Sequence, residues 1–263
     1  MKVQTATKGK LTPRIDDMRT TLFLPVLNER IGAELIMPRI DRSWVDEIIV
    51  VDGHSTDGTR EYFMENGYTV IDQKGPGLGS TYWDCLEVAT GDVIIPFSPD
   101  NNSIPELIPD LVAKMAEGYD MVIASRYKGE ARSDDDDLVT ALGNWMFTKL
   151  INVLFRGSYT DTLVMFRAFR RDLFDELSIE QTSLPIVEYQ LAIRCALNKC
   201  KVAEIPGDEP KRVGGIRKMR PLYNGSVLLA ALFKDLLTQN RLKKVYNSRV
   251  NKDPKTQKTS CAS

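Results

Sequence analysis

Apolar and polar positions alternate along the first half of the chain with the two periods typical of strands and helices. Short apolar runs predict buried strands at residues 20–27, 46–52, 68–72, 92–97 and 120–124. Helical patterns lie between them, at residues 31–40, 59–67, 79–89 and 104–118. This strict alternation favours an α/β fold with a mostly parallel sheet, flanked by helices and joined by right-handed crossovers.

The regular alternation of predicted strands and helices ends after Arg126. We predict a long helix, a strand, a second helix and a short strand, at residues 138–155, 163–169, 186–199 and 202–206. A C-terminal amphipathic helix is expected at 223–246, behind one folded domain at 18–222. The polar ends, 1–17 and 247–263, are predicted to be a disordered leader and a disordered tail.

Acidic side chains follow the first two predicted strands. Asp52 ends the apolar run IIVV and precedes the turn GHSTDGT, and Glu29 follows the strand that contains Pro25. Because parallel strands end at one edge of a sheet, both acids should line one crevice, where they suit the hydroxyl and N–H groups of a nucleoside. The alternative is helix capping, above all for Asp57.

A third acid, Asp100, follows the strand at 92–97 in the motif FSPDNN. Mg²⁺ often takes one or two carboxylates and completes its shell with water and substrate phosphates. A divalent cation at Asp100 is therefore one interpretation, and an Asx turn formed with Asn101 and Asn102 is the other.

Composition narrows the class of protein. The chain has 263 residues, is 43% hydrophobic and carries a formal net charge of −1. Its overall charge therefore does not favour binding to nucleic acid. Four cysteines without a CxxC pair indicate a reducing, cytoplasmic location. No segment is expected to cross a bilayer, and no signal sequence is apparent.

Charge is distributed unevenly near the C-terminus. Between Lys211 and Arg249 there are ten Lys or Arg residues and one acid, Asp235. An apolar helix among these cations suits the cytoplasmic face of a membrane, with peripheral contact to anionic lipid. The alternative is a helix packed on the domain or on another subunit.

Six motifs in register resemble family 2 glycosyltransferases of the GT-A fold: LPVLNE, VVDGHSTDGT, GLGSTYWDCLEVATGD, FSPD, ASRY and TDTLVMFRAFRR. They are most similar to the polyprenyl-phosphate branch, of the dolichol-phosphate mannose synthase type. The resemblance implies a GDP- or UDP-linked sugar donor, Mg²⁺ or Mn²⁺, and an inverting single displacement.

The resemblance also implies roles for residues at the donor site. Its nucleotide-sugar contacts would be Pro25, Glu29, Asp52, Lys74, Gly77, Gly79 and Ser98. Asp100 would be the principal metal ligand. Ser98 stands where the family's Asp-x-Asp motif has its first Asp, so metal affinity without donor should be weak.

On the acceptor side, the resemblance implies that Arg126 contacts phosphate and that Asp161 is the first candidate for a catalytic base. Arg212 and Lys218 would add positive charge for a phosphate acceptor. The acidic run 134–137 is predicted to be a solvated loop, and its charge disfavours a phosphate nearby.

The acceptor is therefore expected to be a polyprenyl phosphate, and the alternative is a sugar hydroxyl in a glycan or glycolipid. Two other classes stay open. One is a catalytically silent protein that binds nucleotide sugars, for which Ser98 argues. The other is a nucleotidyltransferase, although LPVLNE lacks the Gly-rich, basic loop that such enzymes carry after the first strand.

Overall fold

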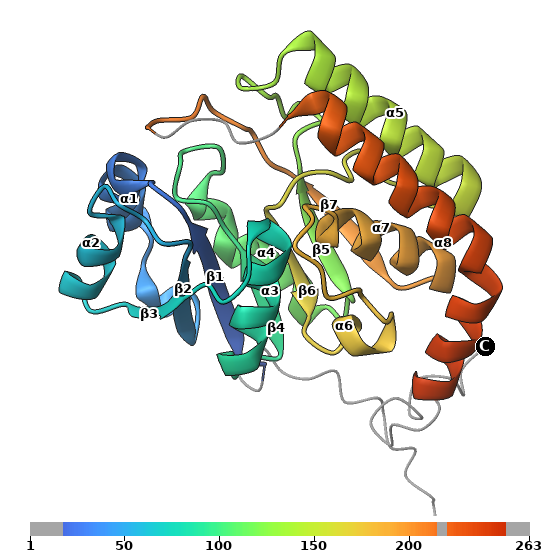
Figure 1. Cartoon of the computed structure of the whole chain (residues 1–263), viewed down its shortest axis with the longest axis horizontal. Helices are drawn as coiled ribbons and strands as arrows, with labels where there is room; N and C mark the ends of the chain where they lie inside the picture. Colours follow the sequence, from blue (N-terminus) through green and yellow to red (C-terminus); the bar gives the residue numbers. More distant parts are fainter. Residues whose placement is uncertain (1–17, 215–219, 251–263) are drawn as a thin grey trace, which may run out of the picture.

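A seven-stranded sheet forms the centre of the computed structural model, which describes residues 18–214 and 220–250 (Figure 1). The strand order is β3-β2-β1-β4-β6-β5-β7. The strands are β1 (Thr20–Val26), β2 (Glu47–Asp52), β3 (Thr69–Asp72), β4 (Val93–Pro96), β5 (Met121–Ser125), β6 (Arg167–Arg170) and β7 (Val202–Pro206). All neighbours pair in parallel except β6, which is antiparallel to both β4 and β5. The prediction of a mostly parallel sheet is confirmed.

Helices cover the sheet: α1 (Arg30–Ile36), α2 (Thr59–Glu65), α3 (Gly77–Val88), α4 (Ile108–Ala116), α5 (Leu138–Phe155), α6 (Leu173–Glu176), α7 (Val187–Asn198) and α8 (Pro221–Val250). Short 3-10 turns occupy Met37–Arg39, Arg42–Trp44 and Pro105–Leu107. The helix expected at 31–40 ends early because proline at position 38, lacking an N–H, starts a 3-10 turn there. The strand expected at 163–169 is confined to β6.

Strands β1, β4 and β5 run through the core with their apolar side chains almost wholly buried. Each is covered on both faces, which is why their sequences are nearly continuous apolar runs. The same arrangement brings the carboxyl ends of β1, β2 and β4 to one edge, and it is this edge that carries the acids at positions 29, 52 and 100.

Helix α8 is longer than the sequence predicts. It continues to Val250, so Asn247–Val250 belong to the helix rather than to the expected tail. The predicted leader and the remainder of the tail lie outside the described residues. One face of α8 packs against α7, and Asp235 on that face forms a buried ion pair with Arg194, at 2.7 Å. For this face, the packed-helix alternative is confirmed.

Helix α5 lies beside α8 along one flank of the molecule (Figure 1). Within the described ranges, it alone is long and apolar enough to cross a membrane, with 18 residues and a mean hydropathy of 1.3. Only 28% of it is buried. The expectation that no segment reaches this length and composition was therefore wrong.

Candidate active site

The end of β2 places Asp52 in a nearly closed setting. The residue is 1% exposed, and its Oδ2 accepts a hydrogen bond from the Ser55 N–H at 3.1 Å. Its Oδ1 is buried and has no hydrogen-bond partner among the described residues. An unpaired buried carboxylate oxygen is costly, so this atom is ready to accept an N–H or O–H group from a ligand.

The turn after Asp52 is tied to the turn after β1. Asn28, with φ of 54°, donates its N–H to Ser55 Oγ at 2.9 Å and accepts from the Thr56 N–H at 2.8 Å. Asp57 accepts from the N–H groups of Arg30 and Thr59, near the starts of α1 and α2. The N-cap residue of α2 is Gly58, so Asp57 is not the cap itself, but its carboxylate accepts the first N–H of both helices and holds the two turns together.

Glu29 lies between these turns and is 4% exposed. Its N–H donates to Thr59 Oγ1 at 2.9 Å, which fixes its backbone at the start of α1. Pro25 is half-buried in β1, opposite Val51 of β2 and one residue before the pair Val26 and Asp52. The structure therefore places Pro25, Glu29 and Asp52 at one edge, as the sequence predicts.

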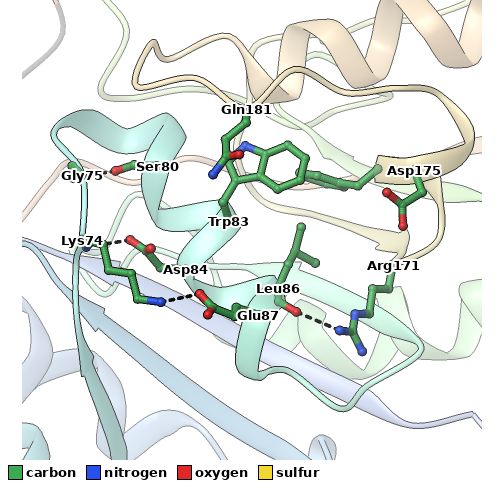
Figure 2. A pocket seen from close by; sticks show the side chains of 11 residues that line it. Lys74, Gly75, Ser80, Trp83, Asp84, Leu86, Glu87, Arg171, Asp175 and Gln181 are labelled. Atoms are coloured by element: carbon green, nitrogen blue, oxygen red, sulfur yellow. Dashed lines mark hydrogen bonds and ion pairs between the residues drawn. The ribbon is translucent and has the colours of Figure 1, made fainter.

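Lys74 makes its contacts with side chains of α3. Its ammonium group pairs with Glu87 on the exposed side of α3, and its N–H donates to Asp84 at 3.0 Å. These side chains line a cavity of about 550 Å³, together with Trp83 and Arg171. Figure 2 shows the residues that line it. Neither Asp52 nor Asp100 lines this cavity.

Gly77 and Gly79, at the start of α3, lie against the segment 182–184. A Cβ atom would come within 2.2 Å of Ser183 O at Gly77 and within 2.3 Å of Thr182 O at Gly79. Gly77 also has φ of 76°, in the left-handed region that favours glycine. Packing alone accounts for both glycines, and their contact with a nucleotide stays a prediction.

Asp100 sits in the tight turn after β4 and is 2% exposed. Its Oδ1 accepts from the Asn102 N–H at 3.0 Å, and Asn101 has φ of 72°, so the predicted Asx turn is confirmed. The Asn102 amide donates to Asp135, but its Oδ1 is buried and unpaired within the described part of the chain. The sequence places Asn102 in the Asx turn, and the structure adds that its amide oxygen is unpaired among the described residues.

These oxygens suit a hard cation that takes its remaining ligands from water and a diphosphate. Across residues 18–214 and 220–250, there is no cluster of three or more His, Cys, Asp or Glu side chains that suits a metal ion. The protein's contribution would be the Asp100 carboxylate and the Asn102 amide oxygen. Ser98, next to them in the chain, is half-buried.

Arg212 occupies an unexpected place. Its Nη1 lies 2.8 Å from Asp100 Oδ2 and 3.8 Å from Glu29 Oε1. The resemblance assigned this residue to an acceptor phosphate, whereas the structure joins it to the predicted donor acids. Lys218, assigned the same role, lies outside the described residues.

Arg126 follows β5 and is surrounded by carboxylates. It contacts Asp161 through Nε at 2.7 Å and through Nη2 at 3.1 Å. Its Nη1 lies 3.2 Å from both Asp136 and Glu209. The guanidinium is thus neutralised within the protein, and a phosphate at this point would compete with these acids.

Asp161 is 0% exposed and accepts backbone N–H bonds from Leu163 and Val164, each at 3.2 Å. Burial would by itself raise the pKa of this carboxyl, but the Arg126 charge and hydrogen bonds hold the pKa below its usual range. A carboxylate with a lowered pKa is a weak base. The geometry favours Asp161 as the group that positions Arg126.

The expectation of a solvated loop holds for only part of the acidic run, since Asp134 and Asp137 are exposed whereas Asp135 and Asp136 are half-buried. The Asp136 side chain is 5% exposed and pairs with Arg126, and the Asp137 carboxylate caps α5 by accepting from the Thr140 N–H at 2.8 Å. Asp135 accepts from Asn102 at 2.9 Å. These contacts fold the run onto the site because buried cations and N–H groups need anionic partners.

Glu209 is a further residue of this cluster that was not predicted from the sequence. Burial, the largest influence, raises the pKa of this carboxyl, and the neighbouring Arg126 only partly offsets it. The signal was available, since Glu209 follows β7 much as the other acids follow β1, β2 and β4.

Known proteins resemble this chain in sequence and in fold. The sequence profile of glycosyl transferase family 2 matches residues 22–178. Glycosyltransferase AglJ of Haloferax volcanii is 25% identical over 84% of this chain and 73% of its own length. A dolichyl-phosphate hexose transferase of the same organism is 28% identical over 85% of this chain and 96% of its own length.

An undecaprenyl-phosphate 4-deoxy-4-formamido-L-arabinose transferase of Pectobacterium carotovorum is 30% identical over 60% of this chain and 51% of its own length. Among solved structures, glucosyl-3-phosphoglycerate synthase of Mycobacterium tuberculosis, in complex with Mn²⁺, UDP and phosphoglyceric acid, matches with a TM-score of 0.62. The match covers 88% of this chain and 84% of that chain at 24% identity, and it shows the fold. Because the family profile matches more than half of the chain, the protein belongs to glycosyl transferase family 2.

Proposed function

We propose that this protein is an inverting glycosyltransferase that moves a sugar from a nucleotide sugar to a polyprenyl phosphate. The observation that carries the donor half is the pair of buried, unpaired oxygens, Asp52 Oδ1 and Asn102 Oδ1, on turns at one edge of the sheet. The first suits a nucleoside N–H or hydroxyl, and the second suits a cation shared with the diphosphate.

A bound Mg²⁺ or Mn²⁺ would neutralise the diphosphate as it leaves. Asp100 and Asn102 would hold the cation, in keeping with the Mn²⁺ and Mg²⁺ complexes of glucosyl-3-phosphoglycerate synthase. Asp52 and Glu29 would orient the nucleoside. Single displacement then inverts the anomeric carbon, because the acceptor attacks from the face opposite the leaving group.

The acceptor assignment draws on relatives named for dolichyl-phosphate and undecaprenyl-phosphate transfer. A phosphate acceptor is already ionised near neutral pH and requires no general base. The lowered pKa of Asp161 is compatible with that chemistry. Arg126 would orient the acceptor phosphate by exchanging one of its carboxylate partners for it.

Exposed apolar side chains on α5 and α8 support contact with a membrane, where such acceptors reside. On α5 they include Leu138, Leu142 and Trp145, whose spacing places them along one side of the helix. On α8, Phe233 and Leu237 are exposed, at 56% and 85%. Helix α8 also carries the basic residues Lys234, Arg241, Lys243, Lys244 and Arg249, which suit anionic headgroups.

Purified protein should transfer labelled sugar from one of a panel of UDP- and GDP-sugars to a polyprenyl phosphate in detergent or liposomes. The product should be an organic-soluble glycosyl phosphate with inverted anomeric configuration by NMR. Asp52→Ala should weaken donor binding and lower transfer with it, while the exposed Asp72→Asn variant should retain both. Transfer to no polyprenyl phosphate across the panel would contradict this acceptor.

A sugar hydroxyl is the second candidate acceptor, and Glu209 favours it. Three carboxylates already surround Arg126, and burial raises the pKa of Glu209 above its usual value. Glu209→Gln would then lower the rate by about 10²- to 10⁴-fold with donor binding intact. A phosphate acceptor predicts a much smaller loss.

A further inference from the structure

A short segment crosses the turn that carries Asp100. We call residues 211–214 the strap. The Val213 N–H donates to Asp100 O at 2.9 Å, and the Asn101 amide donates to Lys211 O at 2.8 Å. Both bonds use strap backbone atoms, so the strap is held in place without the side chain of Arg212.

The Arg212 side chain reaches from the strap into the donor site. Its Nη1 is 2.8 Å from Asp100 Oδ2 and 3.8 Å from Glu29 Oε1. The two acidic side chains are 2% and 4% exposed, whereas that of Arg212 is 24% exposed. Buried carboxylates need a compensating positive charge, and here the chain supplies it from its own strap.

A divalent cation at Asp100 would compete with this guanidinium. Mg²⁺ binds carboxylate oxygens at about 2.0–2.1 Å, and it would have to share Oδ2 with a donor that now lies 2.8 Å away. A metal ion and a guanidinium bound to the same carboxylate also repel each other in a poorly solvated site. The guanidinium and a divalent cation therefore compete for the Asp100 carboxylate.

We propose that Arg212 is an internal counter-ion of the cation site, which holds Asp100 in the donor-free protein and must leave before a divalent cation binds. The inference rests on the proposed function only for the choice of Asp100 as the cation ligand. The cation then enters together with the nucleotide diphosphate, because the diphosphate offers the displaced guanidinium a new anionic partner. Free metal binds weakly, since the competent state is a minor one.

Titration of the full chain with Mn²⁺ alone, followed by electron paramagnetic resonance, tests the inference. Arg212→Gln should bind Mn²⁺ about tenfold or more tightly than the wild type, within the roughly 5- to 150-fold range typical of coupled sites. Lys211→Gln removes the same charge from the same strap but leaves the ion pair, so its Mn²⁺ affinity should equal that of the wild type. Adding Asp100→Asn to Arg212→Gln should abolish the gain.

Arg212→Lys keeps the positive charge and should bind Mn²⁺ more weakly than Arg212→Gln. Wild-type Mn²⁺ affinity in Arg212→Gln, or an equal gain in Lys211→Gln, would overturn the inference. Glycosyl transfer does not enter this measurement. If the wild type transfers no sugar but the variants show the expected changes in Mn²⁺ affinity, only the proposed function is contradicted. If the wild type transfers sugar but Arg212→Gln leaves Mn²⁺ affinity unchanged, only the Arg212 inference is contradicted.

Discussion

The buried pair of Arg126 and Asp161 allows a test that separates an ion-pair partner from a catalytic base. The perturbation is Asp161→Asn, which keeps the shape of the side chain and removes its charge. The variant loses the charge in a contact of 2.7 Å, for which an effective dielectric constant of about 20 gives an attraction of roughly 6 kcal/mol. Desolvation in the wild type offsets much of that attraction.

Removal of one partner from a buried pair typically costs about 3–5 kcal/mol. The Arg126 guanidinium keeps Asp136 and Glu209, each at 3.2 Å, so it is not left without an anion. We therefore expect Asp161→Asn to lower the free energy of unfolding by about 2–3 kcal/mol at pH 7. The melting temperature should fall by roughly 5–10 °C for a domain of this size.

The pH dependence of this loss identifies the state of Asp161. The pKa of Asp161 is lowered in the folded protein. Its contribution to the free energy of unfolding is therefore fully present above the pKa of an unfolded Asp, about 3.9, and is lost as the pH falls through the pKa of the folded protein. Urea unfolding of wild type and variant should give a difference in the free energy of unfolding that is constant between pH 5 and 8 when both proteins also carry Glu209→Gln, because Glu209 contacts the same guanidinium and has a raised pKa. The exposed pair of Arg60 and Asp72 provides a control, because Asp72→Asn should change stability by less than about 1 kcal/mol.

A base poised near neutral pH would behave differently. If, in the Glu209→Gln background, the difference made by Asp161→Asn changes between pH 5 and 7, or is absent at pH 7, the ion-pair account is refuted. A general base at Asp161 would then return as the better explanation of its position.

Three further predictions concern the donor site and the membrane. Asp52→Ala should weaken nucleotide binding by about 1.5–3 kcal/mol in calorimetry, the loss expected for a charge-assisted hydrogen bond; unchanged affinity in a folded variant would count against the site. Gly32→Ala should disturb Mn²⁺-dependent donor binding because its Cβ would come within 2.3 Å of Pro99 O, whereas Gly143→Ala, with open space around it, should leave that binding unchanged. Sedimentation with anionic liposomes should fade as salt shortens screening to about 8–10 Å, and Leu142→Glu should weaken it; a protein that stays in the supernatant at low salt would contradict membrane contact.

Several parts of the fold followed from local sequence alone. The five predicted strands of the first half appear as β1 to β5. For the buried strands β1, β4 and β5 the reason is that a parallel strand covered on both faces must be a nearly continuous apolar run. The acids at 29, 52 and 100 were placed correctly at one edge, because parallel strands end on the same side. The family could be identified in the same way, since its motifs are short and lie in register along the chain.

Other features depend on segments that are far apart in sequence. Strand β6 enters between β4 and β5 in the opposite direction, which a four-residue strand pattern cannot indicate. Helix α8 is anchored by Asp235 to Arg194, so the one acid in a basic segment is a packing residue. Nothing local in the sequence distinguishes that role from a solvated charge.

The partners of the charged side chains were likewise decided by the tertiary structure. Arg126 pairs with Asp161 and Arg212 pairs with Asp100, across 35 and 112 positions of the chain. Residue type predicts that a buried charge needs a partner, but not which one, because many acids and bases satisfy that need equally well. Sequence therefore determined that the acids at positions 29, 52 and 100 meet at one edge of the sheet, and chain packing decided which charged side chains neutralise one another.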